Sequence, residues 1–381
     1  MNILPHIQKR DELIDVLRGI AIIIVLMLHF HLSYPLNIFK SWSFDFLMHG
    51  NYGVTIFFVI SGYLISSNAL KRYGDLSSIN IKHFYPIRCA RILPPLCLAL
   101  TIISLLFILD LKSFTNSVYK EEVDNPSLTL TIVSVLTFWH NIMMDYYGYF
   151  NYAINIYWSL SVEEFFYLIF PIACISLKNK KSIIFILISI IILSPIYRYY
   201  NRNDEIVFMY SYLACFDAIS IGILSALLKH NRKYYYQKNL IRYIGFALIG
   251  FVYFILGIHG FEAIGFTIVS LGTGLIIISS YSQGFKSNII TKILSFLGGI
   301  SYELYLFHII LLGLIRNVIV PKTLSGVSTI VLLCIFLCSS VLIAHIISKF
   351  YSEPINKFFR RRLMKDNCQN NPVIDQKLSR Y

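Results

Sequence analysis

Two basic side chains, Arg18 and His29, stand eleven residues apart within the apolar run DVLRGIAIIIVLMLHFH. On a helix this spacing places both on nearly the same face, about 16 Å apart along the axis. A neutral imidazole, with an ordinary pKa of about 6.5, can take a proton from a hydroxyl near neutral pH. The pair predicts a cleft in which a cation holds an anionic ligand and His29 acts as a base. The alternative is that Arg18 is a membrane-surface cation and His29 a packing residue.

Two adjacent carboxylates, Glu163 and Glu164, follow in the apolar stretch YWSLSVEEFFYLIFP. Neighbouring residues on a helix point about 100° apart, so at most one of them faces a given partner. Such a carboxylate could orient and stabilise the imidazolium of His29. A structural salt bridge to another helix is the open alternative.

Other ionisable residues inside apolar runs are also candidates, because an ionised group in hydrocarbon costs several kcal/mol unless it is paired. Asp217 lies among small residues, which favours helix packing with one polar bond. Glu303 and His308, in ISYELYLFH, remain open between a functional and a structural role. His31 points about 200° away from His29, so the two cannot easily share an ion, and we predict no metal site.

Arg88 and Arg91 stand three apart in PIRCARILPPL, so both can face one anion. Arginine forms bidentate hydrogen bonds with phosphate oxygens, which makes this segment a candidate phosphate site. The alternative is that Arg88 and Arg91 are ordinary cations of a cytoplasmic loop. The seven cysteines include no CxxC pair and no zinc spacing, and we expect them to act as small hydrophobic residues.

The surrounding chain is strongly apolar. Of its 381 residues, 56% are hydrophobic and only 14% are charged, which argues against a soluble domain. A transmembrane helix needs about 20 apolar residues. Ten apolar segments are separated by hydrophilic breaks, at approximately 14–33, 52–70, 89–109, 158–177, 183–197, 206–228, 240–258, 261–282, 293–315 and 327–348.

The net charge of +13 follows the loops between these segments. If both termini are cytoplasmic, the inner stretches hold 25 of the 33 Lys and Arg residues. The outer loops then hold seven, one of which is Arg198. The remaining cation, Arg18, lies at the inner end of span one. This is the positive-inside pattern, and no nucleic-acid partner is needed to explain the charge. We predict an all-α, multi-pass protein of the cell membrane with ten transmembrane helices, both termini cytoplasmic, in contact with membrane lipids.

Residues 128–144 do not fit as a further span, because counting them would reverse every later loop. We predict a re-entrant or interfacial helix on the outer side. The expected organisation is a cytoplasmic N-terminus over 1–13, a transmembrane domain over 14–350 and a cytoplasmic tail over 351–381. The part of the tail after Arg362 is polar, and we expect it to be disordered.

An ordered set of motifs from Arg10 to Pro354 resembles the membrane-bound acyltransferase 3 family, which includes O-acetyltransferases of O-antigen and other surface polysaccharides. The matching elements are Arg18 and His29; FFVISGYLI (57–65) through Ser61 and Gly62; IRCARILPP (87–95) through Arg88, Arg91 and Pro94; WSLSVEEFFYLIFP (158–171) through Trp158, Ser159 and Glu163 or Glu164; GGISYELYLFH (298–308) through Ser301, Tyr302, Tyr305 and His308; and YSEPINKFF (351–359) through Glu353 and Pro354.

The resemblance implies ten spans and transfer of an acyl group, usually acetyl, from coenzyme A to a glycan hydroxyl at the outer face, in lipopolysaccharide or a similar lipid-linked or surface polysaccharide. It implies that His29 is the catalytic base and that Arg18 helps bind the donor. Acetyl-CoA would be a co-substrate, and we expect no permanently bound cofactor. Some family members carry an extracytoplasmic hydrolase-like domain, and we expect this chain to act without one.

These expectations combine into one hypothesis for the site. Phosphates of coenzyme A would bind Arg88 and Arg91, while its pantetheine arm runs past Arg18 towards His29. Glu163 or Glu164 would hold the imidazole, and Ser61 or Trp158 would bind the developing oxyanion. The expected supporting residues are Asp15, Ser61, Trp158, Ser159, Tyr302, Tyr305 and His308.

Two other classes of function remain. A ten-span bundle with internal polar residues also suits a secondary transporter of a small or glycan-related solute. Against this, Gly and Pro breaks do not recur in corresponding halves of the sequence. A catalytically silent scaffold is the third possibility, and it predicts that replacing His29 changes nothing.

Overall fold

The computed structural model describes residues 11–36, 45–118, 123–230, 238–280, 288–320 and 326–370, and this part of the chain is helical without strands. Apolar runs become helices because a helix satisfies its own backbone hydrogen bonds, as a bilayer requires. The helices are α1 (Glu12–Ser33), α2 (Asn51–Tyr73), α3 (Ile81–Ile108), α4 (Leu128–Leu136), α5 (His140–Tyr147), α6 (Trp158–Leu177), α7 (Lys180–Tyr200), α8 (Glu205–Tyr210), α9 (Tyr212–His230), α10 (Lys238–Phe251), α11 (Gly265–Ser279), α12 (Ile289–Gly299), α13 (Ser301–Val318), α14 (Gly326–Ile347) and α15 (Glu353–Asn370).

The helices agree closely with the predicted spans. Within the described ranges, eight helical stretches are long and apolar enough to cross a membrane, or nine if the bent pair α12 and α13 forms one span. The remaining predicted segment, 261–282, corresponds to α11, an apolar helix of 15 residues. The chain is thus a helical protein with several candidate membrane spans.

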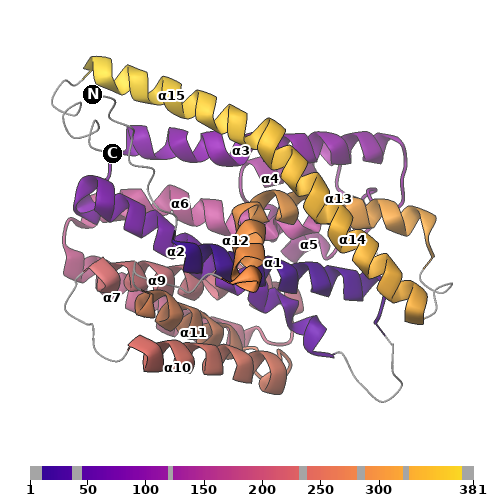
Figure 1. The fold of residues 1–381 in the computed structure, drawn as a ribbon, viewed down its shortest axis with the longest axis horizontal. Coiled ribbons are helices and arrows are strands. Elements are labelled where there is room, and N and C mark those ends of the chain that lie inside the picture. The colour runs from indigo at the N-terminus through magenta and orange to yellow at the C-terminus, as the bar shows by residue number, and fades with distance from the viewer. Residues whose placement is uncertain are drawn as a thin grey trace.

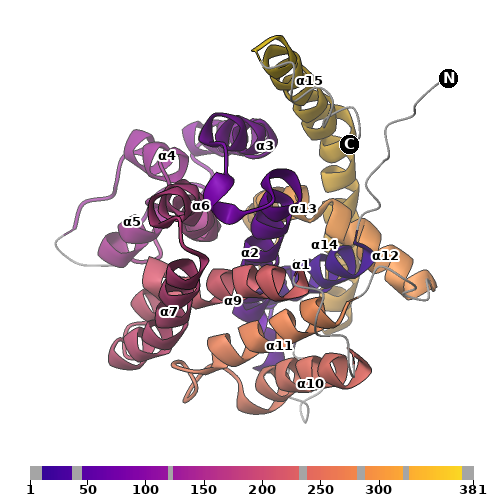
Figure 2. The same cartoon turned by 90° about the vertical axis from the view of Figure 1, so that its left-hand side faces the viewer.

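Helices α1, α2 and α13 lie in the middle of the bundle, with α3 and α6 on one side and α9, α10 and α11 on another (Figures 1 and 2). Helix α12 runs across the others and meets α13 at an angle of 75° (Figure 1). This bend brings α13 alongside α1, with which it packs. Two helices that are distant in sequence therefore meet in the centre of the molecule.

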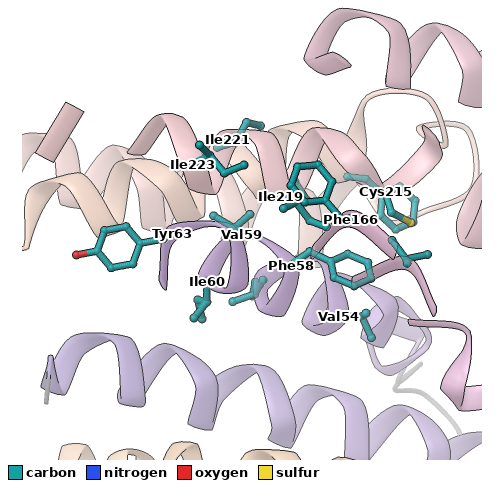
Figure 3. Packing of buried hydrophobic residues seen from close by; sticks show 14 of the residues in the cluster. Val54, Phe58, Val59, Ile60, Tyr63, Phe166, Cys215, Ile219, Ile221 and Ile223 are labelled. Atoms are coloured by element: carbon teal, nitrogen blue, oxygen red, sulfur yellow. The ribbon is translucent and has the colours of Figure 1, made fainter. Parts of the chain in front are cut away.

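The contact between α2 and α9 depends on small residues. A Cβ atom on Gly62 would overlap the carbonyl oxygen of Ile219, and one on Gly222 would overlap that of Val59. Each helix therefore has a glycine where the other helix's backbone comes closest, as is typical of helices packed within a membrane. Around these glycines, apolar side chains of both helices interdigitate, as do Val59 and Ile219 in Figure 3.

The structure of segment 128–144 differs from the predicted re-entrant or interfacial helix. It is not a single helix but two short ones, α4 and α5, separated at Phe138, whose φ is 64°. A hydrogen-bond network crosses the break: Ser134 Oγ lies 2.8 Å from His140 Nδ1, and the His140 backbone N–H donates to Ser161 Oγ at 3.1 Å. These buried contacts tie both short helices to α6, which explains a break that no glycine or proline marks.

Arg198, assigned above to an outer loop, is instead fully buried in the last turn of α7. It pairs with Asp217 of α9 at 2.7 Å and donates to the carbonyl oxygens of Ala214 and Ala263. Thr267 of α11 also donates to Asp217, at 2.6 Å. Asp217 therefore makes more than the single polar bond predicted, and its contacts join α7, α9 and α11.

The described part of the C-terminal tail is helical, whereas disorder was predicted after Arg362. Helix α14 continues through a π-helical turn, Ser348–Ser352, into α15, which extends to Asn370. Residues 363–370 are therefore helical rather than disordered. Helix α15 packs on α3, and Tyr351 donates a hydrogen bond to the carbonyl oxygen of Pro94 at 3.4 Å. In Figure 1, α14 and α15 form one long diagonal rod over the bundle.

Candidate active site

The imidazoles of His29 and His308 meet between α1 and α13. Their ring centroids are 5.0 Å apart, and His308 Nε2 lies 3.2 Å from His29 Nδ1. His308 is fully buried, whereas His29 is half-buried. His308, whose role the sequence left open, is thus the direct neighbour of His29, the proposed base.

Backbone carbonyls fix the protonation of both rings. His29 Nδ1 lies 3.0 Å from the carbonyl oxygen of Val25, and His308 Nδ1 lies 2.9 Å from that of Leu304. A carbonyl only accepts, so each Nδ1 carries the hydrogen and each Nε2 carries a lone pair. His29 Nε2 is then available as a base, while His308 Nε2 accepts from the shared Nδ1–H of His29.

Arg18 lines a cavity of about 120 Å³ between α1, α2, α3, α6 and α13. Its guanidinium lies 3.8 Å from the carboxylate of Asp15, one turn earlier on α1. Together with Arg18, the lining residues are Val54, Phe57, Phe58, Ile60, Ser61, Leu64, Asn68, Arg88, Arg91, Ile92, Ser159, Leu160, Glu163, Glu164, Tyr167, Ser301, Tyr302, Tyr305 and Leu306. The cavity therefore brings together residues from every motif of the resemblance except the exit motif at 351–359.

Neither His29 nor His308 lines this cavity. Tyr305 does line it, and its ring centroid lies 6.0 Å from that of His308. Its hydroxyl donates to the carbonyl oxygen of Ile156 at 2.8 Å and lies 2.6 Å from Ser159 Oγ. Tyr305 thus forms the part of the cavity wall that contacts His308, and it is anchored to the start of α6.

The two adjacent glutamates lie in the cavity wall rather than beside His29. Glu163 Oε1 accepts hydrogen bonds from Ser61 and from Tyr167, both at 2.5 Å, and lies 3.4 Å from Arg88 Nη2. Glu164 Oε1 lies 3.9 Å from the same Arg88 nitrogen. In this structure His308, and not a carboxylate, therefore holds the imidazole of His29.

Arg88 and Arg91 differ in environment although both line the cavity. The Arg88 guanidinium stacks over the Tyr167 ring, 3.4 Å from its centroid, and faces both glutamates. Arg91 is exposed. A phosphate beside Arg88 would face two carboxylates held against a half-buried guanidinium, whereas the exposed Arg91 can turn towards solvent, so Arg91 is the better placed of the two for an anion.

The other predicted site residues have defined positions. The Ser61 hydroxyl is used by Glu163, and Trp158 packs against Tyr210 with ring centroids 4.4 Å apart, away from the histidine pair. Tyr302 donates to the carbonyl oxygen of Ile92 at 3.0 Å. Neither Ser61 nor Trp158 is presented to His29 as an oxyanion donor in this conformation.

His31 and Tyr167 also have defined positions in the structure. His31 Nδ1 accepts from the backbone N–H of Leu36 at 3.2 Å, which closes the turn after α1. Tyr167 was not singled out from the sequence, although it stands four residues after Glu163 and hence on the same helix face. That spacing was the available signal for it.

Comparison with known proteins identifies relatives of this chain by sequence. A family model described as an acyltransferase domain matches residues 11–349. The chain is 28% identical over 373 residues to a provisionally named O-acetyltransferase of Staphylococcus aureus (strain COL), covering 90% of this chain and 57% of that protein. It is 27% identical over 368 residues to O-acetyltransferase OatA of Staphylococcus aureus (strain NCTC 8325 / PS 47), with the same coverage. The chain thus spans just over half the length of these relatives. No solved structure matches it.

Proposed function

The chain belongs to the acyltransferase 3 family, and on that premise we propose that it is a membrane O-acetyltransferase that transfers acetyl from cytoplasmic acetyl-CoA to a hydroxyl of a surface glycan. The names of its staphylococcal relatives support O-acetyl transfer. The observation that carries the proposal is the His29–His308 pair, because it leaves His29 Nε2 with a lone pair and gives the protonated ring a hydrogen-bond acceptor.

The proposed reaction uses this pair as follows. His29 Nε2 removes the proton from the acceptor hydroxyl as that oxygen attacks the thioester carbonyl carbon. A C–O bond forms, the C–S bond breaks, and the proton on His29 passes to the leaving thiolate. Throughout, the Nδ1–H of His29 donates to Val25 and His308, which keeps the ring oriented.

The donor would occupy the Arg18 cavity. Its phosphates would lie near the exposed Arg91, at the predicted cytoplasmic end, and its slender arm would run along the mostly apolar lining towards Tyr305. The eleven-residue rise from Arg18 to His29 is about 16 Å, comparable with an extended pantetheine arm. For the thioester to reach His29, the Tyr305 wall must open.

The proposal is tested by reconstituting the purified protein in liposomes with acetyl-labelled acetyl-CoA and an extract of lipid-linked glycan. Label should move to the glycan with the wild type and not with His29→Ala. Mass spectrometry of surface polysaccharide from cells with and without the gene should show a gain of acetyl that requires His29. A transporter would instead show solute counterflow without acetyl-CoA, and this result would refute the proposed function.

A further inference from the structure

The wall of the Arg18 cavity contains a hydrogen-bond acceptor and a donor that form no hydrogen bond with any described residue. Glu164 Oε1 and Arg88 Nε are buried and make no hydrogen bond within the described residues. They are close together, because Glu164 Oε1 lies 3.9 Å from Nη2 of the same guanidinium. Buried polar groups are almost always hydrogen-bonded, so two adjacent exceptions in a cavity wall indicate a missing ligand.

The neighbouring groups cannot supply these hydrogen bonds. The hydroxyls of Ser61 and Tyr167 both donate to Glu163, and the Tyr167 ring covers the face of the Arg88 guanidinium. Glu163 Oε1 therefore already accepts two hydroxyl hydrogen bonds, whereas Oε1 of Glu164, which is more than nine-tenths buried, accepts none within the described residues. The arrangement uses one glutamate to fix Arg88 and leaves the other for a ligand.

The chemistry of the missing ligand follows from this wall. Two carboxylates repel a phosphate or another anion, and the guanidinium of Arg88 repels a cation. The group that fits is uncharged, with one N–H for Glu164 and one carbonyl oxygen for the Arg88 Nε–H. Apolar neighbours such as Val54 and Leu160 further favour a slender chain of low polarity.

We propose that Glu164 and Arg88 form a binding subsite for the two secondary amides of the donor's pantetheine arm, the N–H of one donating to Glu164 and the carbonyl oxygen of the other accepting from the Arg88 Nε–H, because the N–H and C=O of a single trans amide point in opposite directions. The inference rests on the proposed function, because it takes coenzyme A as the donor, whose arm contains two such amides. It assigns the two charged residues to recognition of the neutral arm, while the phosphates lie towards the exposed Arg91. Thioesters without amides would then be poor donors.

The test compares two soluble donors of equal length: S-acetylpantetheine, and the acetyl thioester of an oligoethylene glycol thiol, which has no N–H group. In the wild type, kcat/KM should be at least about tenfold higher for S-acetylpantetheine, as expected when a buried acceptor is left without a hydrogen bond. In Glu164→Leu this preference should disappear, because activity with S-acetylpantetheine falls while activity with the glycol thioester does not. Non-enzymatic hydrolysis of both donors is subtracted.

Two further variants sharpen the result. Glu164→Gln keeps a carbonyl acceptor and should retain most of the preference, which separates hydrogen bonding from charge. Glu205→Gln removes an exposed carboxylate that bonds Tyr149, far along the chain from this cavity, and should leave the preference unchanged. Size-exclusion chromatography in detergent checks folding of each variant, and equal use of both donors by the wild type would overturn the subsite even if Glu164→Leu does not fold.

The outcomes distinguish this inference from its premise. Equal use of both donors by the wild type, or an equal loss with both donors in Glu164→Leu, would overturn the amide subsite while leaving acetyl transfer intact. Failure of the wild type to transfer acetyl from acetyl-CoA itself would instead overturn the proposed function.

Discussion

His308 Nε2 lies 3.2 Å from His29 Nδ1, although 279 residues separate them in sequence. Both rings are anchored by carbonyls of their own helices, so the contact depends on how α1 packs against α13. The proposed base is therefore positioned by tertiary structure as well as by its own helix.

Replacing His308 should lower kcat more than it raises KM, because His308 positions His29 without touching the donor cavity. We expect His308→Ala to reduce kcat by about 10–100-fold. His308→Gln should recover part of the loss, because its amide oxygen can accept from His29 Nδ1–H. The measurement is steady-state acetyl transfer in liposomes, and a pure KM effect would contradict the positioning role.

Tyr305 should control the separation of donor and base. Tyr305→Phe removes the hydrogen bonds to Ile156 and Ser159 that anchor the wall. We expect the ratio of acetyl-CoA hydrolysis to glycan transfer to rise several-fold, since a loosened wall admits water to the thioester. Thiol release measured with and without acceptor gives this ratio, and an unchanged ratio would show that the anchor has no gating role.

The α2–α9 contact should not tolerate a larger residue. Gly62→Val would force a side chain into the backbone of Ile219 and should lower the melting temperature in detergent by several degrees. Gly250→Ala on α10 is the matched control, because no atom lies within 4 Å of the added Cβ. If both variants melt alike, the close approach of the two helices does not limit stability.

The buried pair Arg198–Asp217 should be costly to break but not to replace. Asp217→Asn removes one charge and leaves Arg198 uncompensated, which typically costs about 3–5 kcal/mol. The double variant Arg198→Met with Asp217→Leu should recover much of that loss, because it buries no charge. Thermal unfolding of both variants checks the prediction, and equal destabilisation would contradict it.

The sequence predicted positions along the chain better than contacts between distant segments. Arg18 and His29 share α1 and could be related by helix geometry alone. The meeting of His29 with His308 depends on the 75° bend before α13, which hydropathy does not reveal. Glu163 or Glu164 was expected at His29, but Glu163 contacts Ser61 and Tyr167 and Glu164 faces Arg88, because these contacts also depend on how distant helices pack.

Local exceptions were missed for a different reason. The break at Phe138 has no glycine or proline signal and arises from the buried contacts of Ser134 and His140. Arg198 looked like a loop cation because its partner, Asp217, lies on another helix. Because Arg198 pairs with Asp217 on another helix, it is buried in the protein, although its position in the sequence predicted a solvent-exposed loop.

The position of Tyr305 also has a consequence for the cell, if the chain transfers acetyl across a bilayer as proposed. An open aqueous passage from the Arg18 cavity to the histidine pair would then let protons leak across the membrane. Tyr305, which lines the cavity, contacts His308 and is anchored at Ile156, would help the membrane keep its electrical insulation between turnovers.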